Sequence, residues 1–214
     1  MKLPFSHSEF LDVFGAYNAA LWPAATVLWI VTALLFLKWM WTRQADSRAV
    51  ASLLAVHWAW SGLAYHWAFF RSINPAAGLF AALFVVQAVF FAWLALAAER
   101  VRFTLDRSLR GGLGAVLVGY ALVYPFVGLA FGFRYPRMPM FGVPCPTTIL
   151  TAGLLLVASG SPRFINIIPI VWSAIGGSAA FVLGVRADLA LIVAGTLLAL
   201  QTVAPRILAQ NSAA

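Results

Sequence analysis

Seven apolar stretches occupy most of this 214-residue chain, and each is long enough, or nearly long enough, to cross a lipid bilayer. The hydrocarbon core of a bilayer requires about 20 predominantly apolar residues in a helix. We therefore expect an all-α fold, a polytopic membrane helix bundle in which residues 1–214 form a single integral membrane domain. The seven transmembrane helices are predicted at roughly 20–41, 49–70, 75–98, 112–133, 146–160, 163–184 and 188–208.

The composition excludes an ordinary soluble domain. Hydrophobic residues make up 63% of the chain and charged residues 9%, whereas soluble domains carry about 25% charged residues. The first apolar stretch is too long for the core of a signal peptide, so we expect it to remain in the mature protein. The one cysteine, Cys145, excludes an internal disulfide and any metal site built from several cysteines.

Lysine and arginine are distributed unequally between the two sides of the predicted bundle. With seven spans the connections alternate between the sides, and cytoplasmic connections are enriched in these residues. One side receives Lys2, Arg71, Arg134, Arg137 and Arg186, and the other receives Lys38, Arg43, Arg48, Arg100, Arg102, Arg107, Arg110, Arg163 and Arg206. We therefore expect the amino terminus outside and the carboxyl terminus inside. The basic run 100–110 is interpreted as an anchor against anionic lipid headgroups and not as a nucleic-acid site.

Two segments deviate from a simple spanning helix. The fifth stretch, 146–160, has an apolar core of only about fifteen residues, which leaves open a short crossing helix or a re-entrant one. A re-entrant helix would reverse the sidedness of every later segment. Residues 1–19 contain Ser6 and Glu9 at the spacing of a capping box. We expect these residues to form an outer interfacial segment with a short amphipathic helix.

Two histidines lie inside the second predicted span, where ionisable side chains are costly and therefore suggest a function. At 100° per residue, His57 and His66 point to opposite faces of the helix, about 13 Å apart along its axis. They cannot share one metal ion, and the absence of a histidine on any other span disfavours a bis-histidine haem. The alternative is that both imidazoles form interhelical hydrogen bonds.

Soft metal ligands cluster in the connection before the fifth span. Met138, Met140 and Cys145 supply sulfur ligands of the kind that suits Cu(I) or another thiophilic ion. The alternative is that the methionines are ordinary interface residues and that the cysteine is inert.

Polar residues gather in the outer halves of the predicted spans, which predicts an outward-facing pocket. The candidates for its lining are Asn18, Trp22, His57, His66, Arg71, Asn74, Arg134, Thr147, Thr148 and Asp188. Arg71 or Arg134 is expected to pair with Asp188 or to remain available for an anionic solute. In the alternative interpretation, Asp188 and Asn74 cap the seventh and third helices.

The order of several polar and proline-containing motifs resembles a bacterial family of multi-pass inner-membrane proteins of unknown function. The motifs are Tyr17-Asn18, Trp22-Pro23, the run from His57 to Asn74-Pro75, Gln87, Pro144 to Thr148, and Pro169 to Gly177. The resemblance covers nearly the whole chain and implies a location in the bacterial inner membrane. It implies no activity, cofactor or catalytic residue.

Enzyme motifs are absent from the sequence. We find no Walker loop, no paired intramembrane carboxylates, no zinc-protease helix and no Gly-x-Ser-x-Gly elbow. We therefore predict a non-enzymatic carrier or binder of a small solute, with no cofactor favoured and with the lipid bilayer as its first partner. A homo-oligomer remains open. The alternative function is a redox or soft-metal-handling membrane component that uses His66, Met138, Met140 and Cys145.

The predicted topology places Cys145 near the outer surface and the carboxyl terminus in the cytoplasm, because most basic residues otherwise fall on the wrong side. Reporter fusions after Gly111 and after Ala214 should therefore both report a cytoplasmic location. A cytoplasmic signal at Gly111 combined with an external signal at Ala214 would mean that residues 146–160 do not cross the membrane.

Overall fold

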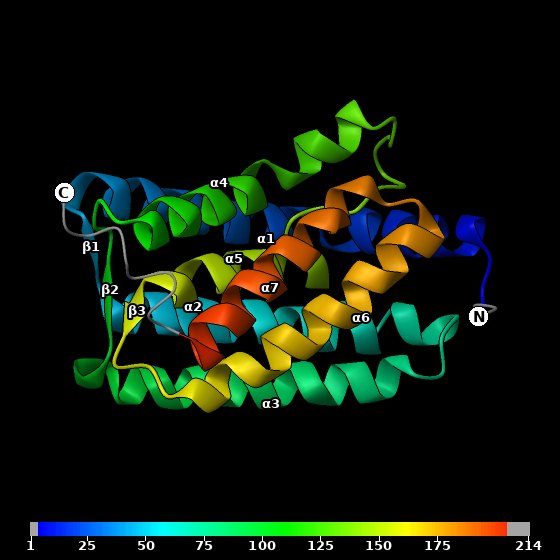
Figure 1. Ribbon diagram of the computed structural model, residues 1–214. Coiled ribbons are helices and arrows are strands. Elements are labelled where there is room, and N and C mark those ends of the chain that lie inside the picture. The colour runs from blue at the N-terminus through cyan, green and yellow to red at the C-terminus, as the bar shows by residue number, and fades with distance from the viewer. Residues whose placement is uncertain (1–3, 205–214) are drawn as a thin grey trace.

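The computed structural model of the protein describes residues 4–204, which are almost entirely helical (Figure 1). The α-helices are α1 (His7–Thr42), α2 (Ser47–Trp60), α3 (Ala77–Leu96), α4 (Leu109–Ala130), α5 (Pro144–Val157), α6 (Ile167–Leu183) and α7 (Ala190–Val203). A π-helix, η1 (Ser61–Trp67), continues α2, and 3-10 turns lie at η2 (Phe70–Ser72), η3 (Ala98–Arg100), η4 (Arg163–Asn166) and η5 (Arg186–Leu189). Three short strands are β1 (Gln44–Ala45), β2 (Arg102–Thr104) and β3 (Ala158–Ser159).

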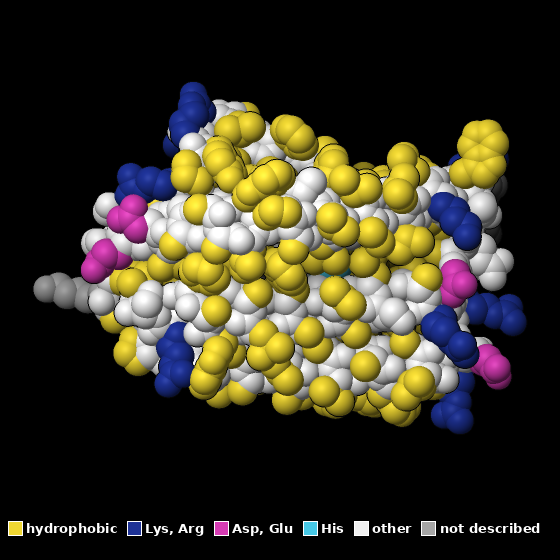
Figure 2. Space-filling view, turned by 180° about the vertical axis from the view of Figure 1, so that it is seen from behind, with side chains coloured by type: hydrophobic (Ala, Val, Ile, Leu, Met, Phe, Trp, Pro, Cys, Tyr) yellow, Lys and Arg dark blue, Asp and Glu magenta, His cyan; other side chains and the backbone are white. Residues whose placement is uncertain are grey.

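The outer surface of the molecule matches a lipid environment. Five segments of the described chain are long and apolar enough to cross a membrane, namely His7–Thr42, Ala77–Leu96, Leu109–Ala130, Arg163–Leu183 and Arg186–Val203. Figure 2 shows that Lys, Arg, Asp and Glu lie near the two ends of the molecule, with hydrophobic side chains across the surface between them. Exposed apolar area of this extent is typical of a membrane contact and not of a soluble monomer.

The amino-terminal capping box is confirmed, but the first helix is longer than expected. The Ser6 backbone N–H donates to the Glu9 carboxylate at 2.7 Å, and the Glu9 N–H donates to the Ser6 hydroxyl at 3.3 Å. From this cap α1 runs without interruption for 36 residues, so the segment before residue 20 and the first span form one helix. At 1.5 Å per residue α1 is about 54 Å long, well beyond the roughly 30 Å hydrocarbon core.

The three strands form an antiparallel sheet that closes one end of the bundle (Figure 1). Gln44 pairs with Thr104, and Phe103 pairs with both Ala45 and Ala158. The strands follow α1, α3 and α5, so the carboxyl ends of these three helices meet at this end. Helix α5 therefore runs in the same direction as α1 and α3. Beside the sheet, Asp46 accepts a hydrogen bond from the Ala49 N–H that lowers the pKa of its carboxyl group and caps α2.

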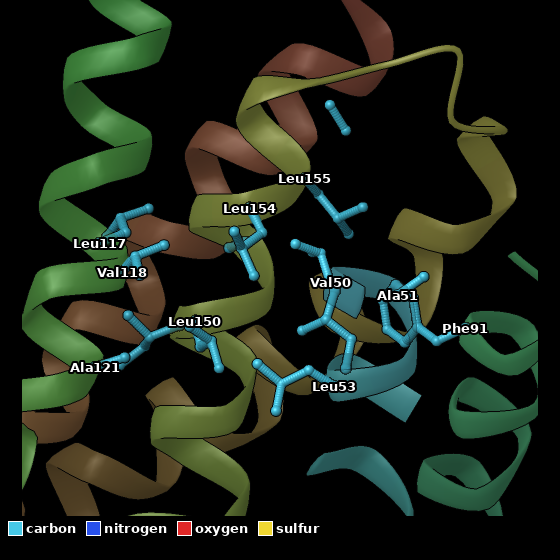
Figure 3. Packing of buried hydrophobic residues seen from close by; sticks show 14 of the residues in the cluster. Val50, Ala51, Leu53, Phe91, Leu117, Val118, Ala121, Leu150, Leu154 and Leu155 are labelled. Carbon is cyan, nitrogen blue, oxygen red and sulfur yellow. The ribbon is translucent and has the colours of Figure 1, made fainter. Parts of the chain in front are cut away.

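Helix α5 lies at the centre of the bundle. All of its residues are buried except Cys145, which is partly exposed. In Figure 3, Leu150 and Leu154 of α5 lie between side chains of α4, among them Val118, and side chains of α2, among them Leu53. Because protein surrounds α5 on all sides, this helix does not have to match the thickness of the bilayer. The non-helical backbone that flanks a short helix is tolerated at membrane depth where protein covers it.

Glycines bring α4 and α5 into backbone contact. A Cβ atom placed on Gly114 would lie 2.7 Å from the carbonyl oxygen of Gly153, and one on Gly153 would lie 2.7 Å from the carbonyl oxygen of Gly114. Glycine also allows close packing of α6 and α7, since a Cβ atom on Gly176 would lie 2.8 Å from the Cδ1 atom of the Leu191 side chain. Small residues at helix crossings allow this close packing in membranes.

Gly153→Ala should therefore lower the free energy of unfolding by about 1–3 kcal/mol, because the new methyl group meets backbone atoms that cannot move aside cheaply. Gly112→Ala is the matched control, since its Cβ atom would meet nothing within 4 Å. This control should be neutral or stabilising by up to about 1 kcal/mol through helix propensity. Thermal unfolding of both variants in detergent measures the difference. Equal unfolding midpoints would contradict the α4–α5 contact.

Candidate functional site

A pocket of about 520 Å³ lies in the half of the molecule away from the sheet. Its walls come from the start of α1, η1, η2 and the start of α3, the second half of α4, the start of α5, α6 from Trp172 onward, and η5. We call it the aromatic pocket, and its main lining side chains are Phe10, Phe14, Tyr65, His66, Phe70, Phe80, Tyr124, Cys145, Trp172 and Asp188.

The π-helix η1 presents Tyr65 and His66 to this pocket. Its wider turns are visible in the hydrogen bond from the Ala68 N–H to the Leu63 carbonyl oxygen, five residues earlier. On the same helix Gly62 lets α3 approach closely, because a Cβ atom there would lie 3.1 Å from the carbonyl oxygen of Ala81. Short π-helices inside longer helices are rare and occur frequently at functional sites.

His66 is enclosed by aromatic rings and lacks a hydrogen-bonding partner. Its side chain is 1% exposed, with ring centroids at 4.9 Å from Phe84 and 5.0 Å from Trp172. Among the described residues, neither ring nitrogen of His66 has a hydrogen-bonding partner, and the indole nitrogen of Trp172 lacks one too. Buried polar atoms are nearly always paired, so three unpaired ones beside a pocket make it a candidate binding site.

Asp188 places a buried carboxyl group in the wall of the same pocket. It is 6% exposed and accepts a hydrogen bond from the hydroxyl group of Tyr124. The thiol of Cys145 is a second close neighbour of this carboxyl group. The backbone is fixed next to it, because the Tyr120 hydroxyl donates to the carbonyl oxygen of Ala187 at 2.8 Å. Helices α4 and α5 therefore position the carboxyl group together.

The expected pairing of Asp188 with an arginine is wrong. The guanidinium group of Arg71 lies over the Trp67 ring, 4.1 Å from its centroid, and Arg134 donates to the carbonyl oxygens of Leu129 and Phe133. Within residues 4–204, Arg137 and Asp12 form the one salt bridge. Neither arginine lines the aromatic pocket. A guanidinium group on a ring face or on carbonyl oxygens already has favourable contacts outside the pocket.

Of the two helix caps that the sequence suggests, the one at Asn74 forms and the one at Asp188 does not. Asn74 lines the pocket, and its side-chain oxygen also accepts a hydrogen bond from the Ala76 N–H at 3.0 Å, at the start of α3. The cap of the seventh helix expected of Asp188 is absent, because its carboxyl group turns toward Tyr124 and α7 begins without a side-chain capping bond. The carboxyl group is therefore directed at the interior of the bundle.

His57 lies outside the aromatic pocket and is paired through one ring nitrogen, whereas its Nδ1 atom lacks a hydrogen-bonding partner among the described residues. Its Nε2 atom lies 2.9 Å from the Thr32 hydroxyl of α1. One turn later, Ser61 donates to the carbonyl oxygen of Gly142 at 2.8 Å and lies 3.1 Å from the Thr147 hydroxyl. The hydroxyl of Thr148 donates to the carbonyl oxygen of Pro144 at 2.9 Å. These contacts support a structural role for His57, Thr147 and Thr148, and they place the two histidines on different faces of the helix, as predicted.

A second pocket, of about 240 Å³, contains the remaining candidates. It lies between α1 and the part of α4 that turns away from the bundle near Pro125 (Figure 1). Asn18, Trp22, Met138 and Met140 line it. The Asn18 amide donates to the carbonyl oxygens of Pro136 and Met138 at 2.6 and 2.8 Å. The structure therefore separates the two methionines from Cys145 and His66, and it brings together no three His, Cys, Asp or Glu side chains in the described chain.

Tyr124 and Trp172 are site residues that the sequence did not reveal. They lie on α4 and α6, far from His66 in the chain, and neither helix shows a polar stripe that would identify the pocket. One local signal was available, because Gly176 follows Trp172 by one helical turn. A glycine at this spacing leaves the edge of the indole ring uncovered.

Comparison with known proteins identifies a family but no characterised relative. A family model described as "Family of unknown function (DUF6064)" matches residues 7–214. No curated protein and no solved structure matches the chain.

The two histidines should differ in their effect on stability. Thr32→Val leaves the buried Nε2 atom of His57 without its partner and should lower the free energy of unfolding by about 1–3 kcal/mol. His66→Phe removes two unpaired ring nitrogens from aromatic surroundings and should be neutral or stabilising by about 1 kcal/mol. Thermal unfolding in detergent tests both variants. A comparable loss in the two would show that His66 has a structural hydrogen bond.

Proposed function

Since the chain belongs to the DUF6064 family, whose function is unknown, we propose its function from the aromatic pocket. The protein is a multi-pass membrane protein that carries or binds a small solute, which enters the pocket from the outer side of the bacterial inner membrane. The observation that carries this proposal is His66, whose two unpaired ring nitrogens border the pocket.

The dimensions and lining of the pocket support a solute site. Small-molecule sites typically have volumes of about 300–1,000 Å³ and apolar walls with a few polar groups that orient the ligand. The aromatic pocket has both properties, because aromatic and aliphatic side chains surround His66, Asn74 and Asp188. It therefore provides space for a small molecule and specific polar contacts.

The sheet supports the proposed count of seven crossings. The short helix α5 ends at the same sheet as α1 and α3, which is the arrangement expected if α5 crosses completely. Together, α2 and η1 cover Ser47–Trp67, which supplies the second crossing.

The distribution of basic residues supports the proposed orientation. In the described chain, the connections and the adjoining helix ends at the sheet end contain Lys38, Arg43, Arg48, Arg100, Arg102, Arg107, Arg110 and Arg163. The opposite end contains Arg71, Arg134, Arg137 and Arg186. This bias favours a cytoplasmic sheet and places the aromatic pocket on the outer side.

A bound solute should slow chemical modification of Cys145, because this sole cysteine lines the pocket. We propose to screen amines, carboxylic acids, alcohols and sugars for protection of Cys145 against N-ethylmaleimide, with the protein in lipid nanodiscs. At least one class should protect, and His66→Ala should weaken its affinity by about tenfold or more through the loss of a polar partner in a buried site. His57→Ala is the matched control and should retain binding once folded. Protection that survives His66→Ala would contradict the proposed site.

Two further measurements address sidedness and transport. A membrane-impermeant thiol reagent should modify Cys145 in intact spheroplasts, whereas modification only after permeabilisation would place the pocket on the cytoplasmic side. Uptake of the protecting solute into proteoliposomes distinguishes a carrier from a binder, because a binder protects Cys145 without uptake.

A further inference from the structure

We infer that the solute of the aromatic pocket is an organic ammonium ion, held by the Asp188 carboxylate and by the faces of the surrounding aromatic rings. This inference rests on the proposed function, since it names the chemical class that the same pocket binds.

The charge of the pocket carries the inference. Asp188 is the one Asp, Glu, Lys or Arg side chain in the described lining, and the other ionisable groups beside it are His66, Cys145 and two tyrosines. Because the Tyr124 hydroxyl and the neighbouring Cys145 thiol are both hydrogen-bond donors, they suit a carboxylate that accepts. A buried charge is stable only when it is paired and hydrogen-bonded. Since no arginine or lysine in the described chain forms a salt bridge with Asp188, a positively charged solute would supply the missing counter-charge.

The walls of the pocket suit the same class of solute. Trp172, Tyr65 and Phe80 contribute aromatic rings to the lining. The face of an aromatic ring attracts a cation, and the attraction grows when both are removed from water. The remaining walls are largely aliphatic and phenylalanine side chains, which bury an apolar body. The complementary solute therefore has one ammonium group and an apolar remainder.

The same arrangement disfavours an anionic solute. The two arginines that the sequence offers for an anion, Arg71 and Arg134, lie outside the lining. An anion in the pocket would instead meet the carboxyl group of Asp188 without a lysine or arginine to compensate. Like charges that face each other in a desolvated site are strongly unfavourable.

Three probes of similar size separate charge from shape. We propose to measure the binding of 2-phenylethylammonium, 2-phenylethanol and 3-phenylpropionate by isothermal titration calorimetry, with the protein in nanodiscs of neutral lipid. The ammonium probe should bind about tenfold or more tightly than the alcohol, and the carboxylate should not bind measurably. The ammonium probe should also protect Cys145 from N-ethylmaleimide, which locates it in the aromatic pocket.

Asp188→Asn removes the negative charge and keeps an oxygen that can accept the Tyr124 hydrogen bond. It should weaken binding of the ammonium probe by about tenfold or more and should leave binding of the alcohol nearly unchanged. Asp12→Asn is the matched control, because Asp12 is exposed and pairs with Arg137 outside the pocket. This control should not change the affinity of either probe.

The outcomes distinguish this inference from the proposed function. Equal affinity for the ammonium and alcohol probes, or tighter binding of the carboxylate probe, would overturn the inference that the solute is an ammonium ion. The proposed solute site would still hold if that binding requires His66. Failure of all three probes while another solute gives His66-dependent protection of Cys145 also overturns the ammonium class alone. If no solute in the screen protects Cys145, both proposals fail.

Discussion

The burial of α5 inside the bundle is the constraint on which the rest of the structure depends. This helix contacts protein around its whole circumference, so it can be shorter than the thickness of the bilayer. The contact between Gly114 and Gly153 sets how closely α4 can approach, and the sheet fixes where α5 ends. The start of α5 then delivers Cys145 to the aromatic pocket beside Asp188.

Hydropathy predicted the helical elements well, because the cost of exposing backbone groups to lipid leaves helices as the main solution. Two elements were not predictable in this way. The first is the expected boundary near residue 20 between an interfacial helix and the first span. The structure has no such boundary, because the residues before it belong to the same helix, α1. The role of α5 was also ambiguous, because the length of an apolar run does not reveal whether lipid or protein will surround it. The burial of every α5 residue except Cys145 supplies that information.

The candidate site was predictable in its polar members but not in its pairings. His66 was identified because an imidazole in a membrane span is costly, and its face proved to be the one against α3 and α6. Asp188 was identified too, but its partner is Tyr124 and not Arg71. A sequence shows which face of a helix a residue occupies, whereas pairings between helices depend on how those helices meet. For this reason the sequence did not show that Tyr124 and Trp172 lie in the same pocket as His66.

The two ends of the bundle are built differently, which bears on how a solute could pass. Away from the sheet, the helices leave space between polar groups and aromatic rings. Toward the sheet, the interior is filled by packed side chains of α2, α4 and α5, and the strands join three connections. A carrier must open this closed half to release its solute, and the short strands offer few hydrogen bonds to oppose such a change. A binder needs no such opening, so the packing around α5 is the barrier that transport would have to overcome.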